Sequence, residues 1–161
     1  MLRPTTPADT DALVALAAAT GVFKDLEIEA LREVLDDYHA VNHSYGHRAV
    51  TWDAGTPDGF AYFAPTAMTD RTWELWWIAV EPGRQGKGLG GRLLEFVEAE
   101  VGTAGGRILL IETSSLPHYL PTRNFYLKHG YEQSGRIPDF YADGDDKVIF
   151  AKHLSRQSVG A

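Results

Sequence analysis

The stretch RQGKGLGG at residues 84–91 combines four glycines with two cationic side chains, directly before a segment whose apolar residues have helical spacing. A helix N-terminus carries unpaired backbone N–H groups and the positive end of the helix dipole, and glycine lets an anion approach those donors closely. Arg84 and Lys87 would add charged donors. This composition predicts a phosphate-binding turn. The alternative is a loop that needs its glycines only for positive φ angles.

Two common phosphate-binding motifs fit this stretch poorly. A P-loop requires Ser or Thr after its Gly-Lys pair, and Gly88 stands there. The dinucleotide pattern G-x-G-x-x-G is matched by Gly86, Gly88 and Gly91, and Glu112 stands about where a ribose-binding acid is expected. However, the segment EPGRQ separates these glycines from the strand that ends at Val80, and no second βαβ half follows Glu112. A dinucleotide-binding protein is therefore the less favoured alternative.

Glu112 closes the apolar run ILLIE. A carboxylate at the end of an otherwise apolar strand needs a partner, solvent or a function. Two interpretations are open. Glu112 is either a general base that takes a proton from an amine, directly or through water, or one half of a structural ion pair.

The elements that would position these residues follow from the periodicity of the sequence. The predicted strands are 2–4, 47–53, 59–65, 72–80, 107–113, 131–137 and 146–154, and the predicted helices are 9–20, 26–41, 89–101 and 122–130. The apolar stripe predicted for the second helix consists of Leu26, Ala30, Val34 and Tyr38. This order predicts a mixed α/β fold with a largely antiparallel sheet flanked by helices. One domain would span residues 1–154, followed by a flexible tail at residues 155–161.

Composition excludes several classes of function. The 161 residues contain no cysteine, so disulfides, thiolate metal sites and thiol catalysis are ruled out. A net charge of -7 argues against nucleic acid as the main partner and favours cationic ligands. No apolar run approaches the roughly 18 residues of a membrane span, and the N-terminus does not resemble a signal peptide. We therefore expect a cytoplasmic protein that does not bind membranes.

Two segments resemble landmarks of the GNAT superfamily of N-acetyltransferases. WIAVEPGRQGKGLGGRLL, at residues 77–94, is similar to the family's acetyl-CoA signature, a strand and V-x-P followed by [Q/R]-x-x-G-x-[G/A], with Gln85, Gly88 and Gly90 at the signature positions. NFYLKHGYE, at residues 124–132, resembles a helix with an aromatic-tyrosine pair followed by GF or GY. The predicted order of elements also agrees with that family, so the resemblance covers nearly the whole chain.

The resemblance implies a GNAT-like acyl-CoA N-acyltransferase fold and transfer of an acetyl group from acetyl-CoA to a primary amine, by direct attack in a ternary complex and without a metal. It implies that Tyr126 is the general acid that protonates the CoA thiolate, although a packed core aromatic is the alternative. The opposing hypothesis is a CoA-binding sensor without turnover. The implied cofactor contacts are Ile78, Ala79, Val80, Arg84, Gln85, Gly86, Lys87, Gly88, Leu89, Gly90 and Gly91.

The chain departs from the family at two positions. Many members carry Asn seven residues before the tyrosine and a small residue four before it, where this chain has Tyr119 and Thr122. These departures leave the pantetheine contacts at residues 114–122 open. The acceptor is open as well. A tyrosine- and acid-rich stretch resembles one near the acceptor site of ribosomal-protein N-acetyltransferases, which implies acceptor contacts from Asp139, Tyr141 and Asp143, with a solvated loop as the alternative.

Histidines and tryptophans form the remaining candidate clusters. His39, His43 and His47 have a spacing that could bind a metal, but SYG interrupts the helix before His47, so a solvated helix end or contacts to the substrate explain them better. Three tryptophans, Trp73, Trp76 and Trp77, alternate along one predicted strand. Core packing or a homodimer interface explains them better than a stacking platform.

Overall fold

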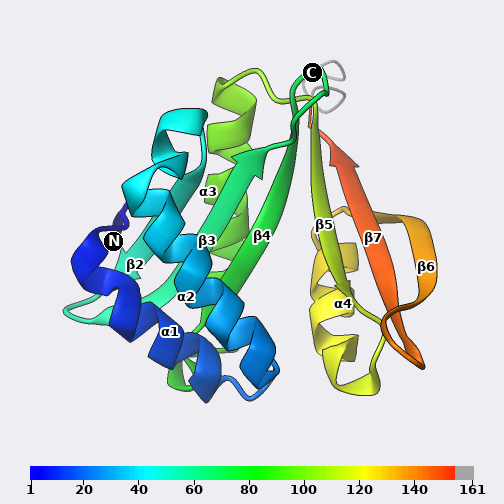
Figure 1. The fold of residues 1–161 in the computed structure, drawn as a ribbon, viewed down its shortest axis with the longest axis horizontal. Helices are drawn as coiled ribbons and strands as arrows, with labels where there is room; N and C mark the ends of the chain where they lie inside the picture. The colour runs from blue at the N-terminus through cyan, green and yellow to red at the C-terminus, as the bar shows by residue number, and fades with distance from the viewer. Residues whose placement is uncertain (155–161) are drawn as a thin grey trace. The chain divides into compact units, whose positions relative to one another are not determined.

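A computed structural model describes residues 1–154 of the chain. Its seven strands are hydrogen-bonded in the order β1-β2-β3-β4-β5-β7-β6, with helices along the sheet (Figure 1). β4 runs parallel to β5, whereas β1–β2, β2–β3, β5–β7 and β6–β7 are antiparallel. The predicted mixed α/β class with a largely antiparallel sheet is confirmed. The predicted tail at residues 155–161 lies outside the described residues.

Every predicted helix and strand is present in the predicted order. The strands are β1 (Leu2–Pro4), β2 (Arg48–Asp53), β3 (Pro57–Pro65), β4 (Thr72–Val80), β5 (Ile108–Ser114), β6 (Glu132–Ala142) and β7 (Asp145–His153). The α-helices are α1 (Thr10–Ala19), α2 (Asp25–Ala40), α3 (Leu89–Thr103) and α4 (Leu120–Lys128). Short 3-10 helices are η1 (Pro7–Asp9), η2 (Asn42–Tyr45), η3 (Pro82–Arg84) and η4 (Pro117–Tyr119).

Residues 1–65 and 76–97 form one compact unit. Helices α1 and α2 lie in front of β2 and β3 in Figure 1, and α3 lies behind them. The core under α1 and α2 contains Leu13, Leu16, Ala17, Leu31, Leu35, Ala49, Phe60, Tyr62 and Ala79. On the other face, α3 lies close to β3, because a Cβ added at Gly59 would lie 3.1 Å from Cδ1 of Leu93. Glycine at this position therefore permits the close contact between helix and sheet.

The apolar face of α2 differs from the predicted stripe. Leu31 and Leu35 are fully buried, and Val34 and Tyr38 pack at the edge of the same core. Leu26 is 76% exposed instead of buried. The buried residues lie three and four positions apart, so the helical period was predicted correctly while the face that packs against the sheet was shifted.

Residues 66–75 and the described residues from 98 onward form a second compact unit. In it, Thr72 of β4 pairs with Ile108 of β5 in parallel, and β5 pairs with β7. The aromatic rings of Tyr126, Tyr131 and Phe150 pack together in its core. The sequence predicted one domain, and β4 and α3 each contribute residues to both units.

β6 is longer than predicted and carries a bulge. The sequence indicated a turn at DFYADGDD, but β6 continues to Ala142, which pairs with Asp145. Ile137 pairs with Lys147, so residues 138–141 lie opposite the single residue Asp146. We call residues 138–141 the β6 bulge. The turn that closes the hairpin is therefore confined to residues 143 and 144.

Candidate functional site

The glycine-rich stretch forms the connection between β4 and α3 within the first unit. Gly86 and Gly88 have φ angles of 78° and 79°, and a Cβ added at either would meet no heavy atom within 4 Å. Backbone strain thus explains glycine at both positions, and the space beside them is open. Backbone strain does not explain the glycines at positions 90 and 91, Gly90 and Gly91, which lie in the first turn of α3. Glycine inside a helix costs about 0.5–1 kcal/mol relative to alanine, so close approach of a ligand is the better explanation there.

Backbone N–H groups without a helical acceptor lie at the start of α3. Its first i to i−4 hydrogen bond runs from the N–H of Arg92 to the carbonyl of Gly88, at 3.1 Å. The N–H groups of residues 89–91 precede this bond, and such groups have no acceptor within their own helix. Together with the helix dipole they form a site suited to a phosphate group.

The two predicted cations differ in their surroundings. Lys87 is exposed. Arg84 lies 3.4 Å from the carboxylate of Asp58, and its Nε is buried without a hydrogen-bond partner within residues 1–154. A buried guanidinium N–H without an acceptor is costly, and the positive charge of this guanidinium favours an anion beside the stretch.

The end of β4 is tied to the glycine-rich stretch. The side-chain amide of Gln85 donates to the carbonyl of Val80 at 3.2 Å, and the N–H of Glu81 donates to the carbonyl of Asp58 at 2.8 Å. Ala79 is buried, whereas Ile78 and Val80 are partly exposed. The structure therefore brings the two predicted sets of cofactor contacts, residues 78–80 and 84–91, together in one unit.

Glu112 lies in the second unit, at the end of β5, and forms an ion pair. Its Oε2 is 2.9 Å from Nζ of Lys147 on β7. The Glu112 side chain is 32% exposed and that of Lys147 is 13% exposed. The structural ion pair predicted as one of the two interpretations of Glu112 is present. The Glu112 carboxylate also retains access to solvent.

Glu74 on β4 is a candidate residue that the sequence reasoning missed. Burial, followed by repulsion from Glu112, raises the pKa of Glu74 to about 7, while Lys147 opposes this rise. A carboxyl group that titrates near neutral pH is suited to general acid–base chemistry. The signal in the sequence was the same as for Glu112, an acid within an apolar and aromatic strand, TWELWWIAV.

Tyr126 lies on α4 and is 4% exposed. Its ring centroid is 5.8 Å from that of Phe150 and 6.0 Å from that of Tyr131. Burial raises the pKa of the Tyr126 phenol, which keeps it protonated at neutral pH. The packing agrees with a core aromatic, and the protonated phenol is the state that a general acid needs.

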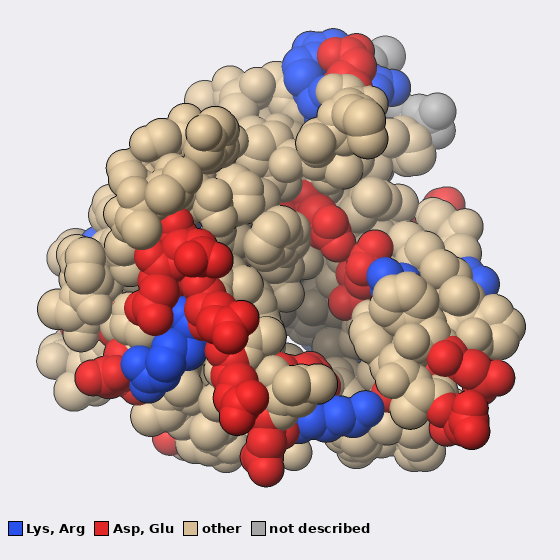
Figure 2. Space-filling view, in the orientation of Figure 1, with Lys and Arg blue, Asp and Glu red and all other residues tan. Residues whose placement is uncertain are grey.

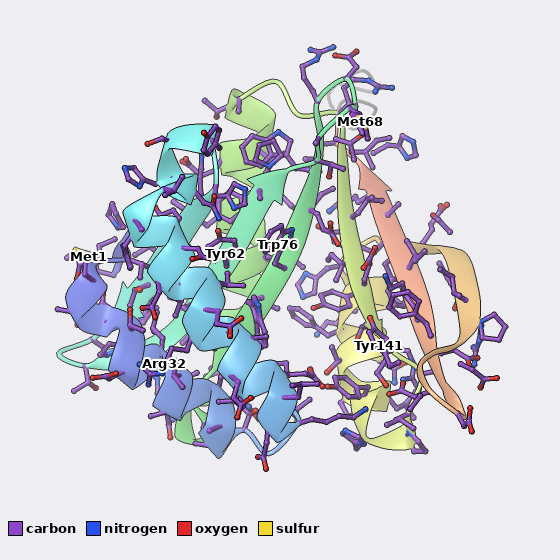
Figure 3. The ribbon with its side chains drawn as sticks, viewed as in Figure 1. Met1, Arg32, Tyr62, Met68, Trp76 and Tyr141 are labelled. Carbon is purple, nitrogen blue, oxygen red and sulfur yellow. The ribbon has the colours of Figure 1, made fainter. Side chains whose placement is uncertain are left out.

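The predicted acceptor residues lie in or next to the β6 bulge. Asp139 has a φ angle of 56°, and its Oδ1 accepts a hydrogen bond of 2.8 Å from the N–H of Gly144. This carboxylate therefore stabilises the hairpin. Tyr141 is 43% exposed and its ring packs against that of Phe140 (Figure 3), and Asp143 is exposed in the turn.

A family model for the acetyltransferase (GNAT) domain matches residues 44–133, which is more than half of the chain. The chain belongs to the GNAT family of acetyltransferases. The matched region of this GNAT chain contains the glycine-rich stretch, Glu74, Glu112 and Tyr126, and it ends before the β6 bulge.

Solved structures resemble this GNAT chain over almost its full length. A protein from Desulfovibrio desulfuricans, provisionally described as a GNAT-family acetyltransferase, is 34% identical, with a TM-score of 0.91 over 96% of this chain and 98% of its own. An aminoglycoside 6'-N-acetyltransferase complexed with coenzyme A is 22% identical (TM-score 0.74, 96% and 97% covered). The ribosomal-protein-alanine N-acetyltransferase from Brucella melitensis is 19% identical (TM-score 0.78, 95% and 99% covered). The last two show the fold alone. No curated protein sequence matches the chain.

In the GNAT chain, His47, Trp76 and Trp77 take part in packing and hydrogen bonding. Nδ1 of His47 lies 2.6 Å from the hydroxyl of Tyr62, and no cluster of three or more metal-ligating side chains exists within residues 1–154. Trp76 packs beside Tyr62 (Figure 3) and is 43% exposed, whereas Trp77 packs against Phe23. The homodimer suggested by the tryptophans stays a prediction. Across the same residues, no helix combines the length and the hydrophobicity needed to span a membrane.

Proposed function

We propose that this GNAT protein is an acetyl-CoA-dependent N-acetyltransferase that acetylates a primary amine by direct attack in a ternary complex. The observation that carries the proposal is the glycine-rich stretch, where open space beside Gly86 and Gly88 adjoins the backbone donors at the start of α3. A pyrophosphate needs both features. A fold neighbour complexed with coenzyme A supports the choice of ligand.

Each part of the stretch would have a distinct role in holding the cofactor. The N–H groups of residues 89–91 would bind the pyrophosphate, with Arg84 and Lys87 adding charge. The backbone of residues 78–80 would pair with the pantetheine arm, and one of its N–H groups would polarise the thioester carbonyl. Residues 84–91 present donors and open space, and so they fit this ligand.

An ammonium acceptor must lose two protons during the reaction, one before its nitrogen attacks and one once the C–N bond has formed. Its nitrogen attacks the thioester carbon, so that a C–N bond forms and the C–S bond breaks. We assign the first of these protons to the carboxylate pair of Glu74 and Glu112, because the charge of Glu112 helps to raise the pKa of Glu74. Since the pKa of Glu74 is raised to about 7, this pair can accept a proton at neutral pH and release it again.

The departing CoA thiolate must gain a proton, which we assign to Tyr126. The second proton that the nitrogen releases returns to the phenolate through solvent, so that one proton is released overall. Burial keeps the phenol protonated, so the proton is available when the C–S bond breaks. The raised pKa also weakens the phenol as an acid. Replacing Tyr126 is therefore a demanding test of this role.

We infer that the acceptor is a cationic amine. The chain carries a net charge of -7, and Figure 2 shows acidic side chains in a row along α2. Neighbours of the same fold include an aminoglycoside 6'-N-acetyltransferase and a ribosomal-protein-alanine N-acetyltransferase. Tyr141 and Asp143 are exposed and therefore better placed than Asp139 to contact an acceptor.

The test combines binding with turnover. Gly88→Val should abolish acetyl-CoA binding in calorimetry, because the side chain fills the space that the pyrophosphate needs. Gly21→Val is the matched control, since Gly21 has a φ angle of 70° with no heavy atom within 4 Å of an added Cβ. Both variants suffer the same backbone strain, and only Gly88→Val should lose binding.

Three results would contradict the proposal. Normal acetyl-CoA affinity in folded Gly88→Val protein would remove the binding assignment. NADH binding without acetyl-CoA binding would favour a dinucleotide site. Acetyl-CoA binding without release of CoA in the presence of polyamines, aminoglycosides, amino acids and peptides would favour a CoA-binding sensor.

A further inference from the structure

Lys147 connects two parts of the second unit that are distant in the sequence. Its ammonium lies 2.9 Å from Oε2 of Glu112 on β5 and 3.7 Å from the ring centroid of Phe140 in the β6 bulge. The Lys147 side chain is only 13% exposed. A partly desolvated ammonium beside a carboxylate and an aromatic face is held more firmly than a surface lysine.

The β6 bulge places the ring of Phe140 over this ammonium. Asp146 supports the bulge by accepting hydrogen bonds from the N–H of Asp139, at 2.9 Å, and from Nε of Arg136, at 2.6 Å. A regular ladder would place one residue opposite Asp146, whereas residues 138–141 occupy that place. The extra residues thus bring an aromatic face to Lys147, an effect often produced by bulges beside functional sites.

Lys147 also acts on Glu74, which pairs with Leu110 of β5, two residues before Glu112 and on the same face of the sheet. Burial and the negative charge of Glu112 on β5 favour the protonated form of Glu74, and the positive charge of Lys147 on β7 opposes them. Glu112, in contrast, is paired directly with Lys147. The ammonium therefore makes the two carboxyl groups unequal.

We propose that Lys147, held in place by Phe140, is a positioning residue of the carboxylate pair: it holds Glu112 in an ion pair and so leaves Glu74 as the member that gains and loses the proton. The kinetic consequence rests on the proposed acetyl transfer, whereas the effect of Lys147 on the titration of Glu74 does not. No step of the reaction requires Lys147 to touch the acceptor or acetyl-CoA.

The first test measures titration directly, without an acceptor. Carbon-13 NMR of the glutamate carboxyl groups, assigned with Glu74→Gln and Glu112→Gln, would follow both residues across pH. Replacing Lys147 by methionine should move the titration of Glu74 upward by about one pH unit, because the positive charge that opposes its protonation is lost. Lys147→Arg retains the charge and should leave the titration near that of the wild type.

Lys152 on the same strand offers a matched control. Its Nζ lies 3.0 Å from Oε1 of Glu98, and its side chain is 12% exposed. Lys152→Met therefore removes an equally buried ion pair from β7 without touching the carboxylate pair, and should leave the titration of Glu74 unchanged. Phe140→Leu should shift it in the same direction as Lys147→Met but less. Because Phe140 is 50% exposed, that variant keeps the test available if Lys147→Met does not fold.

The second test is the pH profile of kcat/KM. In Lys147→Met the acidic limb should move to higher pH by the shift seen in NMR, and kcat/KM should return toward the wild-type value above that limb. Loss of stability without movement of the limb, as expected for Lys152→Met, would indicate a purely structural role. An unchanged Glu74 titration in both Lys147→Met and Phe140→Leu would overturn the proposal. An inactive wild-type enzyme with the NMR shift present would refute the proposed function instead.

Discussion

A buried carboxyl group whose pKa is raised weakens the fold that contains it. For Glu74 the ordinary pKa of 4.5 rises to about 7 in the folded protein. As pH increases between these values, the unfolded chain releases its proton first, so the free energy of unfolding decreases. The full cost is present above about pH 7 and absent below about pH 4.5, and we estimate it at about 1–3 kcal/mol because the side chain keeps some solvent contact.

Glu74→Gln removes this cost, and we expect the variant to be more stable than the wild type at pH 8 but not at pH 4. Differential scanning calorimetry should show a Tm increase of roughly 2–8 °C at pH 8. Turnover should fall, because the amide cannot accept a proton. Glu132→Gln, on the exposed start of β6, is the control and should change neither quantity. An equal Tm change at both pH values would show that folding does not raise the pKa of Glu74.

Tyr126→Phe tests the proposed general acid. The substitution retains the packing of the ring against Phe150 and removes only the hydroxyl. General acid catalysis is typically worth about 10²–10⁴-fold in rate, so kcat should fall strongly while acetyl-CoA affinity and Tm stay near the wild type. Tyr131→Phe is the matched control: its hydroxyl donates to Glu98, so this variant should lose stability but keep its kcat. A decrease in kcat of less than about threefold for Tyr126→Phe would assign Tyr126 to the core alone.

At the scale of single residues, the sequence revealed the groups but not their partners. Composition and spacing identified residues 84–91, and the apolar run ILLIE identified Glu112. Glu74 met the same criterion, but the aromatic residues around it indicated that its strand packs in the core instead. The contact between Glu112 and Lys147 depends on how β5 and β7 pair, and nothing local in either segment predicts that.

At the scale of elements, the type of each helix and strand was predictable, whereas the register was not. The helical period of α2 was visible, but the buried face depends on the sheet against which the helix packs. The acids and glycine of DFYADGDD indicated a turn, because those residues favour turns. In the structure Asp139 and Asp146 instead bind main-chain N–H groups of an irregular strand, which only its pairing with β7 defines.

Asp146→Asn tests whether this bulge serves acceptor binding. The pKa of Asp146 is lowered by hydrogen bonds from the backbone of Asp139 and from Arg136, so the ionised form supports the bulge at neutral pH. A neutral amide should weaken both bonds. We expect faster hydrogen exchange at the N–H of Asp139 and a higher KM for the acceptor, with unchanged acetyl-CoA affinity. Asp70→Asn, which breaks an exposed ion pair with Arg71, should change none of these. An unchanged acceptor KM despite faster exchange would separate the bulge from acceptor binding.

At the scale of the whole molecule, the order of elements and the sheet class followed from the sequence, and the chain length suggested one domain. Contacts divide the described residues into two compact units, and continuous elements, β4 and α3, supply residues to both. The proposed cofactor contacts lie in the first unit, and Glu112 and Tyr126 lie in the second, a division that periodicity does not reveal.

The net charge of -7 acts on every ligand that approaches the protein, and its sign allows a test of the acceptor class. Exposed acids along α2 attract cations, and salt screens that attraction, since the Debye length falls to about 10 Å at 0.1 M ionic strength. With acetyl-CoA saturating, kcat/KM for a polyamine should decrease steeply between about 20 and about 300 mM salt, and that for a monoamine should decrease less.

In α2, Glu29→Gln combined with Glu33→Gln should flatten the polyamine slope and leave kcat unchanged, because both side chains are exposed and belong to neither proposed site. Equal slopes for the two acceptors would show that the acidic surface plays no part in acceptor recognition, and the acceptor class would then have to be sought among weakly charged amines.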